Sequence, residues 1–131
     1  MTTERSVAAA LIVRWIARLW AAALFLFWGA FFVEHTAEWF GRGTPTPPLG
    51  VVALHTLHGL FLVGLLVGWR WELAGGVIAL VAGAAFFMRA AGTNGPLFSL
   101  LSIVPALAWI GLAVYDQRRL VTLEVASVRK R

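Results

Sequence analysis

Four long apolar runs divide this sequence, and they constrain its fold more than any other feature. A helix that crosses a bilayer needs roughly 17–25 mostly apolar residues, and each run is close to that length. The first run has only Arg14 and Arg18 as charged residues, the second has none, and the third has no polar side chain. The runs cover residues 11–33, 49–69, 73–88 and 97–115.

The composition supports a membrane environment. Apolar residues make up 60% of the chain and charged residues 13%, with a mean hydropathy of +0.82. Soluble domains usually have about 45–50% apolar and about 25% charged residues. We therefore predict an all-α integral membrane four-helix bundle that forms a single domain over residues 1–115, with spans at about 11–40, 49–69, 72–90 and 97–115.

The stretch 116–131 is expected to be a basic cytoplasmic tail. Its alternation of apolar and polar residues from Val121 to Val125 suits a short strand or a surface-hugging segment, and a free tail is an equal alternative. Pro105, inside the fourth span, should free the carbonyl of Leu101 and favour a kink.

The basic residues predict the orientation in the membrane. Nine of the eleven Lys and Arg residues would lie on one side, leaving Arg42 and Arg89 on the other. Positive residues collect on the cytoplasmic side, so both termini are expected inside, in a multi-pass protein of the cytoplasmic membrane. Arg14 and Arg18 are expected to snorkel to the headgroups.

Several function classes lack support. The chain has no cysteine, which removes disulfides, thiolate metal sites and thiol redox chemistry. It contains no nucleophile elbow, phosphate-binding glycine loop or zinc-protease helix, so we expect no enzymatic activity from this chain alone. The net charge of +5 is attributed to topology and anionic lipids, and no nucleic-acid partner is expected.

One polar cluster stands out against this apolar background. All three histidines and two acidic residues lie in two patches at the end of the first span and the start of the second, separated by a proline-rich loop that should bring them together. His58 is expected to lie deepest, and its candidate partners are Glu34, Glu38, Arg89, Ser99 and Ser102. The cluster consists of Glu34, His35, Glu38, His55 and His58.

Three interpretations of this cluster remain open, beside a less favoured proton or ion path. The first is a hydrogen-bonded network that fixes helix register. The second is a transition-metal site formed by His35, His55, His58 and a carboxylate from Glu34 or Glu38. The third is a haem or quinone site that uses an imidazole from each helix, or one imidazole and a carboxylate.

Small residues mark candidate packing faces. Gly64 and Gly68 lie four residues apart in the second span, and Gly75, Ala79 and Gly83 form a stripe on the third. Such small residues let neighbouring helices approach closely in a membrane.

Three short motifs carry a resemblance to a known family. They are Arg14-Trp15-Ile16-Ala17-Arg18, the Glu-His-x-x-Glu-Trp-Phe patch from Glu34, and the stretch from Trp69 to Gly76. From Arg14 to Tyr115 the chain resembles a family of small prokaryotic four-span membrane proteins known as a domain of unknown function. That resemblance implies a four-helix membrane fold and no activity, cofactor or catalytic residue.

Two functional hypotheses follow. The first is a small accessory or assembly subunit that packs, within the lipid bilayer, against other membrane subunits or against itself. The alternative is a membrane protein that binds haem, quinone or a metal at the outer ends of the first two helices.

Overall fold

The protein is all-helical, as its sequence predicts. The computed structural model describes residues 2–41, 43 and 45–128, with side chains from residue 6 onward. These residues form four α-helices and one short 3-10 helix, with no strand among them. The elements are α1 (Thr2–Phe40), α2 (Leu49–Gly68), α3 (Glu72–Ala90), η1 (Gly92–Asn94) and α4 (Gly95–Val128).

Proline and glycine set the helix boundaries. Helix α2 begins directly after Pro48, whose carbonyl accepts the main-chain N–H of Val51 at 2.9 Å. Proline suits the position before a helix because its φ is fixed and it has no N–H that would need an acceptor. Gly92 has a φ of +55°, a conformation that glycine adopts without steric cost, and it turns the chain from α3 into η1.

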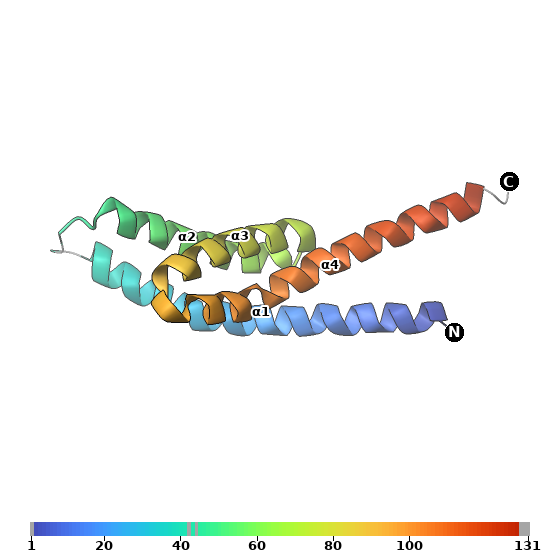
Figure 1. Ribbon diagram of the computed structural model, residues 1–131, viewed down its shortest axis with the longest axis horizontal. Helices are drawn as coiled ribbons and strands as arrows, with labels where there is room; N and C mark the ends of the chain where they lie inside the picture. The colour runs from blue at the N-terminus through green and yellow to red at the C-terminus, as the bar shows by residue number, and fades with distance from the viewer. Residues whose placement is uncertain (1, 42, 44, 129–131) are drawn as a thin grey trace.

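The four helices form a bundle in which each helix packs against the next one along the chain (Figure 1). The most extensive contacts join α2 to α3 and α3 to α4, while α1 lies against α2 and α4. In the described part of the chain, α1 and α3 have no close backbone contact, so they are diagonal partners. The α1–α2 connection lies at one end, and α1 and α4 both extend past the α2–α3 turn at the other (Figure 1).

The core is narrow and aromatic. Its largest fully buried side chains include Phe61 on α2, Phe87 on α3 and Trp109 on α4. Helix α1 buries the smallest share of its side chains, and many large apolar side chains of all four helices are exposed. Each of the four α-helices is long and apolar enough to cross a membrane, which indicates a multi-pass membrane protein.

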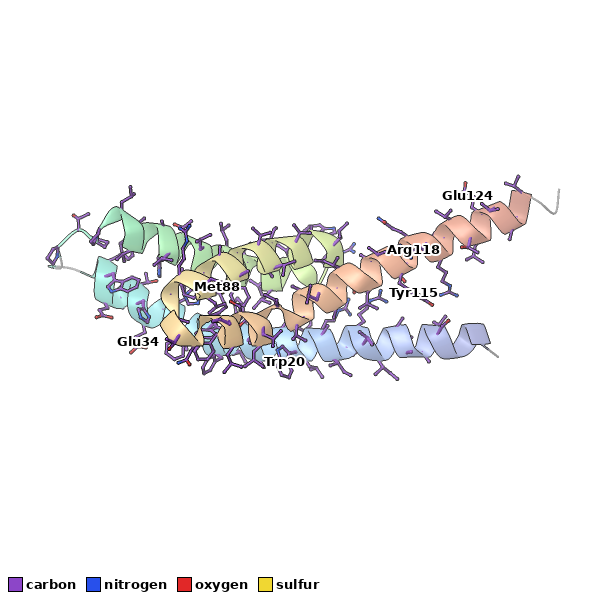
Figure 2. All side chains as sticks on the ribbon, viewed as in Figure 1. Trp20, Glu34, Met88, Tyr115, Arg118 and Glu124 are labelled. Atoms are coloured by element: carbon purple, nitrogen blue, oxygen red, sulfur yellow. The ribbon has the colours of Figure 1, made fainter. Side chains whose placement is uncertain are left out.

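Pro105 lies inside α4 and removes one backbone hydrogen bond of that helix. A side chain of another helix replaces the missing donor. A proline at this position cannot donate to the carbonyl of Leu101, four residues earlier. The indole Nε1 of Trp20 on α1 donates to that carbonyl at 3.1 Å (Trp20 is labelled in Figure 2). The freed backbone acceptor thus becomes a contact between α1 and α4.

Helix α4 does not end where the apolar run ends. It continues as a regular helix to Val128, and the alternation from Val121 to Val125 forms no strand. The side chains from Gln117 to Val128 are all exposed. This part of the helix projects beyond the bundle (Figure 1), where no neighbouring strand is available to pair with an extended segment.

Candidate functional site

A pocket of about 540 Å³ lies where the four helices converge near the α1–α2 connection. All three histidines line it, together with one arginine and a group of aromatic side chains. We call it the histidine pocket. Figure 2 labels Glu34 on α1 and Met88 on α3 at this end of the bundle. The lining is Trp28, Phe31, His35, Trp39, Val51, Leu54, His55, His58, Phe86, Phe87, Arg89, Ala90, Ala91 and Phe98.

His58 is the most enclosed of the three histidines, with 4% of its surface exposed. Its ring stacks on Phe86 at a centroid distance of 4.5 Å and meets the edge of Phe32 at 5.4 Å. Its ring lies beside the main chain of Trp28, whereas its Nε2 has no partner among the described residues. Buried polar atoms are nearly always hydrogen-bonded, so this nitrogen is an unusual feature of the pocket wall.

His35 is held by its own helix. Its Nδ1 lies 2.7 Å from the carbonyl oxygen of Phe31, one turn earlier on α1. A carbonyl oxygen only accepts, so Nδ1 carries the proton and donates. The ring also meets Trp39 edge to face at a centroid distance of 4.7 Å. In neutral His35 the other nitrogen, Nε2, therefore presents a lone pair.

His55 differs because both its ring face and its Nε2 are engaged. The ring stacks on Phe32 at 4.2 Å, and Nε2 lies 2.8 Å from the Thr36 hydroxyl oxygen. That hydroxyl donates its proton to the Phe32 carbonyl at 2.6 Å, so Nε2–H of His55 donates to Thr36. This chain of hydrogen bonds ties α2 to α1 and gives His55 a structural role.

The other candidate site residues do not all reach the histidine pocket. Arg89 lines it, but Glu34 and Glu38 are exposed, and Glu34 faces a separate groove between α1 and α2. Ser99 and Ser102 are buried on α4 and do not line the pocket. The structure therefore gathers the three histidines and Arg89, and leaves both carboxylates outside.

A metal held by protein side chains alone would need more ligands than this arrangement gathers. Among the described residues, no group of three or more His, Cys, Asp or Glu side chains is placed to hold a metal ion. Structural and catalytic zinc sites use at least three protein ligands. The hypothesis of a zinc-like site therefore gains no support from the side-chain positions.

The small residues of α2 and α3 meet along one seam. A Cβ built on Gly64 would lie 2.5 Å from the main-chain nitrogen of Ala79, and one on Gly75 would overlap the backbone of Gly68. A Cβ on Gly83 would lie 2.8 Å from the ring of Phe61, and one on Gly68 would overlap the ring of Trp109. These positions hold α2 and α3 close together, beneath the histidine pocket.

A second polar cluster lies at the opposite end of the bundle, and the sequence analysis missed it. Arg14 on α1 donates to both Glu72 on α3, at 3.2 Å for Nη2, and Asp116 on α4, at 2.7 Å. Arg18 adds a hydrogen bond from Nη2 to the carbonyl of Trp69 at 3.2 Å. We call Arg14, Arg18, Glu72 and Asp116 the arginine cluster.

The expected snorkelling of Arg14 to the headgroups is therefore replaced by pairing inside the protein. The Arg14 side chain is 20% exposed and that of Glu72 13% exposed. Charged residues inside a membrane protein usually pair with one another, so this rule could have predicted acidic partners for Arg14 from the sequence. It pointed to Glu72 and Asp116, the acidic residues that flank the third and fourth apolar runs at this end.

Comparison with known protein families assigns the chain to one family. A family model described as "Domain of unknown function (DUF7670)" matches residues 3–120. The chain belongs to this family. The match includes both the histidine pocket and the arginine cluster, and it confirms the resemblance drawn from the short sequence motifs.

Two further comparisons add no relative. No curated protein matches the chain, and no solved structure matches it. The DUF7670 family description assigns no activity.

Proposed function

We propose that this protein binds a flat, hydrophobic, ring-containing ligand in the histidine pocket, within the cytoplasmic membrane of a prokaryote. The observation that carries the proposal is the unpartnered, buried Nε2 of His58 in an aromatic-walled pocket. Ligand pockets typically enclose about 300–1,000 Å³ and combine apolar walls with a few polar groups. The histidine pocket, at about 540 Å³, has that size and that chemistry.

The aromatic walls support a flat ligand. Phe86 and Phe87 on α3, Trp28 on α1 and Phe98 on α4 line the same pocket. Aromatic rings attract other unsaturated rings in stacked or edge-to-face arrangements, worth about 0.5–1.5 kcal/mol per pair beyond the buried area. Ring ligands therefore match this lining better than aliphatic chains, which cannot form stacked or edge-to-face contacts with the aromatic side chains.

The test is to purify the protein from membranes in mild detergent and extract it with organic solvent. We expect a ring compound to be recovered in about equimolar amount. Leu54→Trp, which fills the pocket, should abolish recovery. The matched control Leu100→Trp, at an exposed site on α4 outside the pocket, should retain it. Recovery of no such compound from the wild-type protein would refute the proposal.

A second candidate function is that of an accessory or assembly subunit. A groove of about 1090 Å³ between α1 and α2 is lined mainly by apolar side chains and by Gly29, Ala30 and Gly59. A Cβ on Gly29 would meet no atom within 4 Å, so this small residue is not used for packing inside the chain. Small residues on an open apolar face favour close approach of another transmembrane helix. We propose that a helix of a partner membrane subunit lies there.

Native purification tests this role. We expect the protein to migrate as part of a larger complex, and Gly29→Trp should release it. Gly111→Trp, at another glycine with open space around it, should not. A wild-type protein that runs alone as a monomer would contradict the accessory role and leave the ligand proposal intact.

A further inference from the structure

This inference rests on the ligand proposal above, and the side chains of the histidine pocket point to one class of ring ligand. We propose that the histidine pocket holds a haem whose iron is bound by Nε2 of His35 and Nε2 of His58, with Arg89 pairing with its propionate groups. The two histidines come from neighbouring helices, α1 and α2, and line the same pocket.

The main-chain neighbours of the two rings indicate which ring nitrogen carries the proton. His35 donates from Nδ1 to the Phe31 carbonyl, so its neutral ring has a bare Nε2. The ring of His58 lies beside the main chain of Trp28, and since its Nε2 has no partner, Nδ1 is the nitrogen available to that main chain. Within a helix the carbonyl is the group with a spare lone pair, so Nδ1 of His58 also donates. Both rings therefore present lone pairs at Nε2.

Two imidazole lone pairs select the kind of ligand that the pocket can bind. They need a Lewis acid or a hydrogen-bond donor, and a quinone, which has only acceptor oxygens, supplies neither. Metal-bound histidines typically donate their other ring nitrogen to a carbonyl or carboxylate, which fixes the tautomer and orients the ring. The bond from His35 to Phe31 has that form, and the main chain of Trp28 lies beside His58 for the same purpose.

The number of protein ligands in the pocket favours haem over a bare metal ion. A bare metal ion would need at least one more protein ligand, and the described residues provide no group of three. Haem iron already has four porphyrin nitrogens and requires only axial ligands from the protein. Two imidazoles complete its coordination. His55 is not needed, because its Nε2 is bonded to Thr36.

The positive charge of Arg89 distinguishes between haem and a quinol. Among the described residues that line the pocket, Arg89 is the one Lys, Arg, Asp or Glu. It is exposed, at the end of α3, and the described residues give it no ion pair. An arginine binds carboxylates through two parallel hydrogen bonds, and haem has two propionate groups. A quinol, the other donor ligand, has no group of that charge, so Arg89 favours haem.

The experiment is optical and electron paramagnetic spectroscopy of the full-length protein purified from haem-replete cells. We expect a Soret band and the low-spin ferric signal of two axial imidazoles. His35→Ala and His58→Ala should each convert the signal to high spin, and the double variant should lose the haem. The matched control His55→Ala should keep the low-spin signal.

A second variant separates ligation from folding. In His58→Gly the low-spin spectrum should be lost and then restored by added imidazole, which a folding defect would prevent. Arg89→Gln should weaken haem retention by roughly tenfold to a hundredfold, the change expected when one charge-assisted pair is lost. Equal haem content in the His35/His58 double variant and the wild type would overturn the assignment.

The outcomes also distinguish this inference from the broader proposal. A protein that carries a quinol and no haem refutes haem ligation and leaves ring binding in the histidine pocket standing. A protein that carries neither refutes both.

Discussion

At the scale of single residues, Arg14 has the most demanding position in the fold. It reaches from α1 across the bundle to its diagonal partner α3 and also to α4, through Glu72 and Asp116. Removing one member of a mostly buried ion pair leaves the other charge without compensation. The backbones of α1 and α3 make no close contact in the described chain, so side chains link them: Arg14 pairs with Glu72 at one end, and Trp28 packs on Phe87 nearer the other.

We predict that Arg14→Gln lowers the free energy of unfolding by about 1–3 kcal/mol, below the full value for a completely buried pair. Unfolding in mixed micelles with increasing SDS measures it. Arg70→Gln, at an exposed arginine in the α2–α3 turn, is the control and should stay within about 0.5 kcal/mol. An equal loss in both variants would show that the pairing contributes nothing.

Trp20 and Pro105 form a second residue-scale pair, because the indole of Trp20 donates to the carbonyl that Pro105 leaves free. We predict that Trp20→Phe costs about 1 kcal/mol, the value of one hydrogen bond. In a Pro105→Ala background the helix satisfies Leu101 itself, so the same change should cost less. A double-mutant cycle on thermal unfolding in detergent checks this, and additive effects would contradict it.

At the scale of helices, the α2–α3 seam decides how the histidine pocket is supported. In a bilayer, helices associate through close packing rather than through the hydrophobic effect, so small residues at the contact matter more than apolarity. At Gly64 the backbone of Ala79 approaches too closely for any side chain.

We predict that Gly64→Ala destabilises the bundle by about 1–3 kcal/mol, because the added methyl group separates α2 from α3. Gly111→Ala is the matched control, since a Cβ there meets nothing within 4 Å. It should be neutral or stabilising by up to about 1 kcal/mol, because alanine restricts the unfolded chain more than glycine. Thermal unfolding in detergent distinguishes them, and similar losses would argue against the seam.

At the scale of the whole molecule, the two polar sites lie at opposite ends of the bundle. The histidine pocket is near the α1–α2 connection, and the arginine cluster is near the α2–α3 turn, at the end toward which α1 and α4 extend (Figure 1). Arginine-rich ends usually face the cytoplasm. We therefore expect the histidine pocket on the extracytoplasmic side.

The orientation can be tested directly because the native chain has no cysteine. We predict that Thr46→Cys, in the α1–α2 connection, is labelled by a membrane-impermeant maleimide in intact cells. Gln117→Cys, exposed on α4, should be labelled only after permeabilisation. Labelling of both thiols after permeabilisation is the control for reactivity, and the reverse pattern in intact cells would place both termini outside.

The sequence by itself determined the class of this protein, its four helices and the place of its polar patches along the chain. Run length and apolar content are sufficient for that, because a bilayer accepts few backbone structures. Helix α4 ran further than its apolar run, because a helix satisfies its own backbone hydrogen bonds without a neighbour.

Only the tertiary structure decided which groups meet. The helices are apolar on nearly all sides, so the pattern along the chain does not mark the buried face, and packing sets the rotation of each helix. That rotation placed His35 and His58 in the wall of the same pocket and left Glu34 and Glu38 outside it. Arg14 was likewise joined to Asp116, far along the chain, because helix packing brings distant residues together and local periodicity does not encode that.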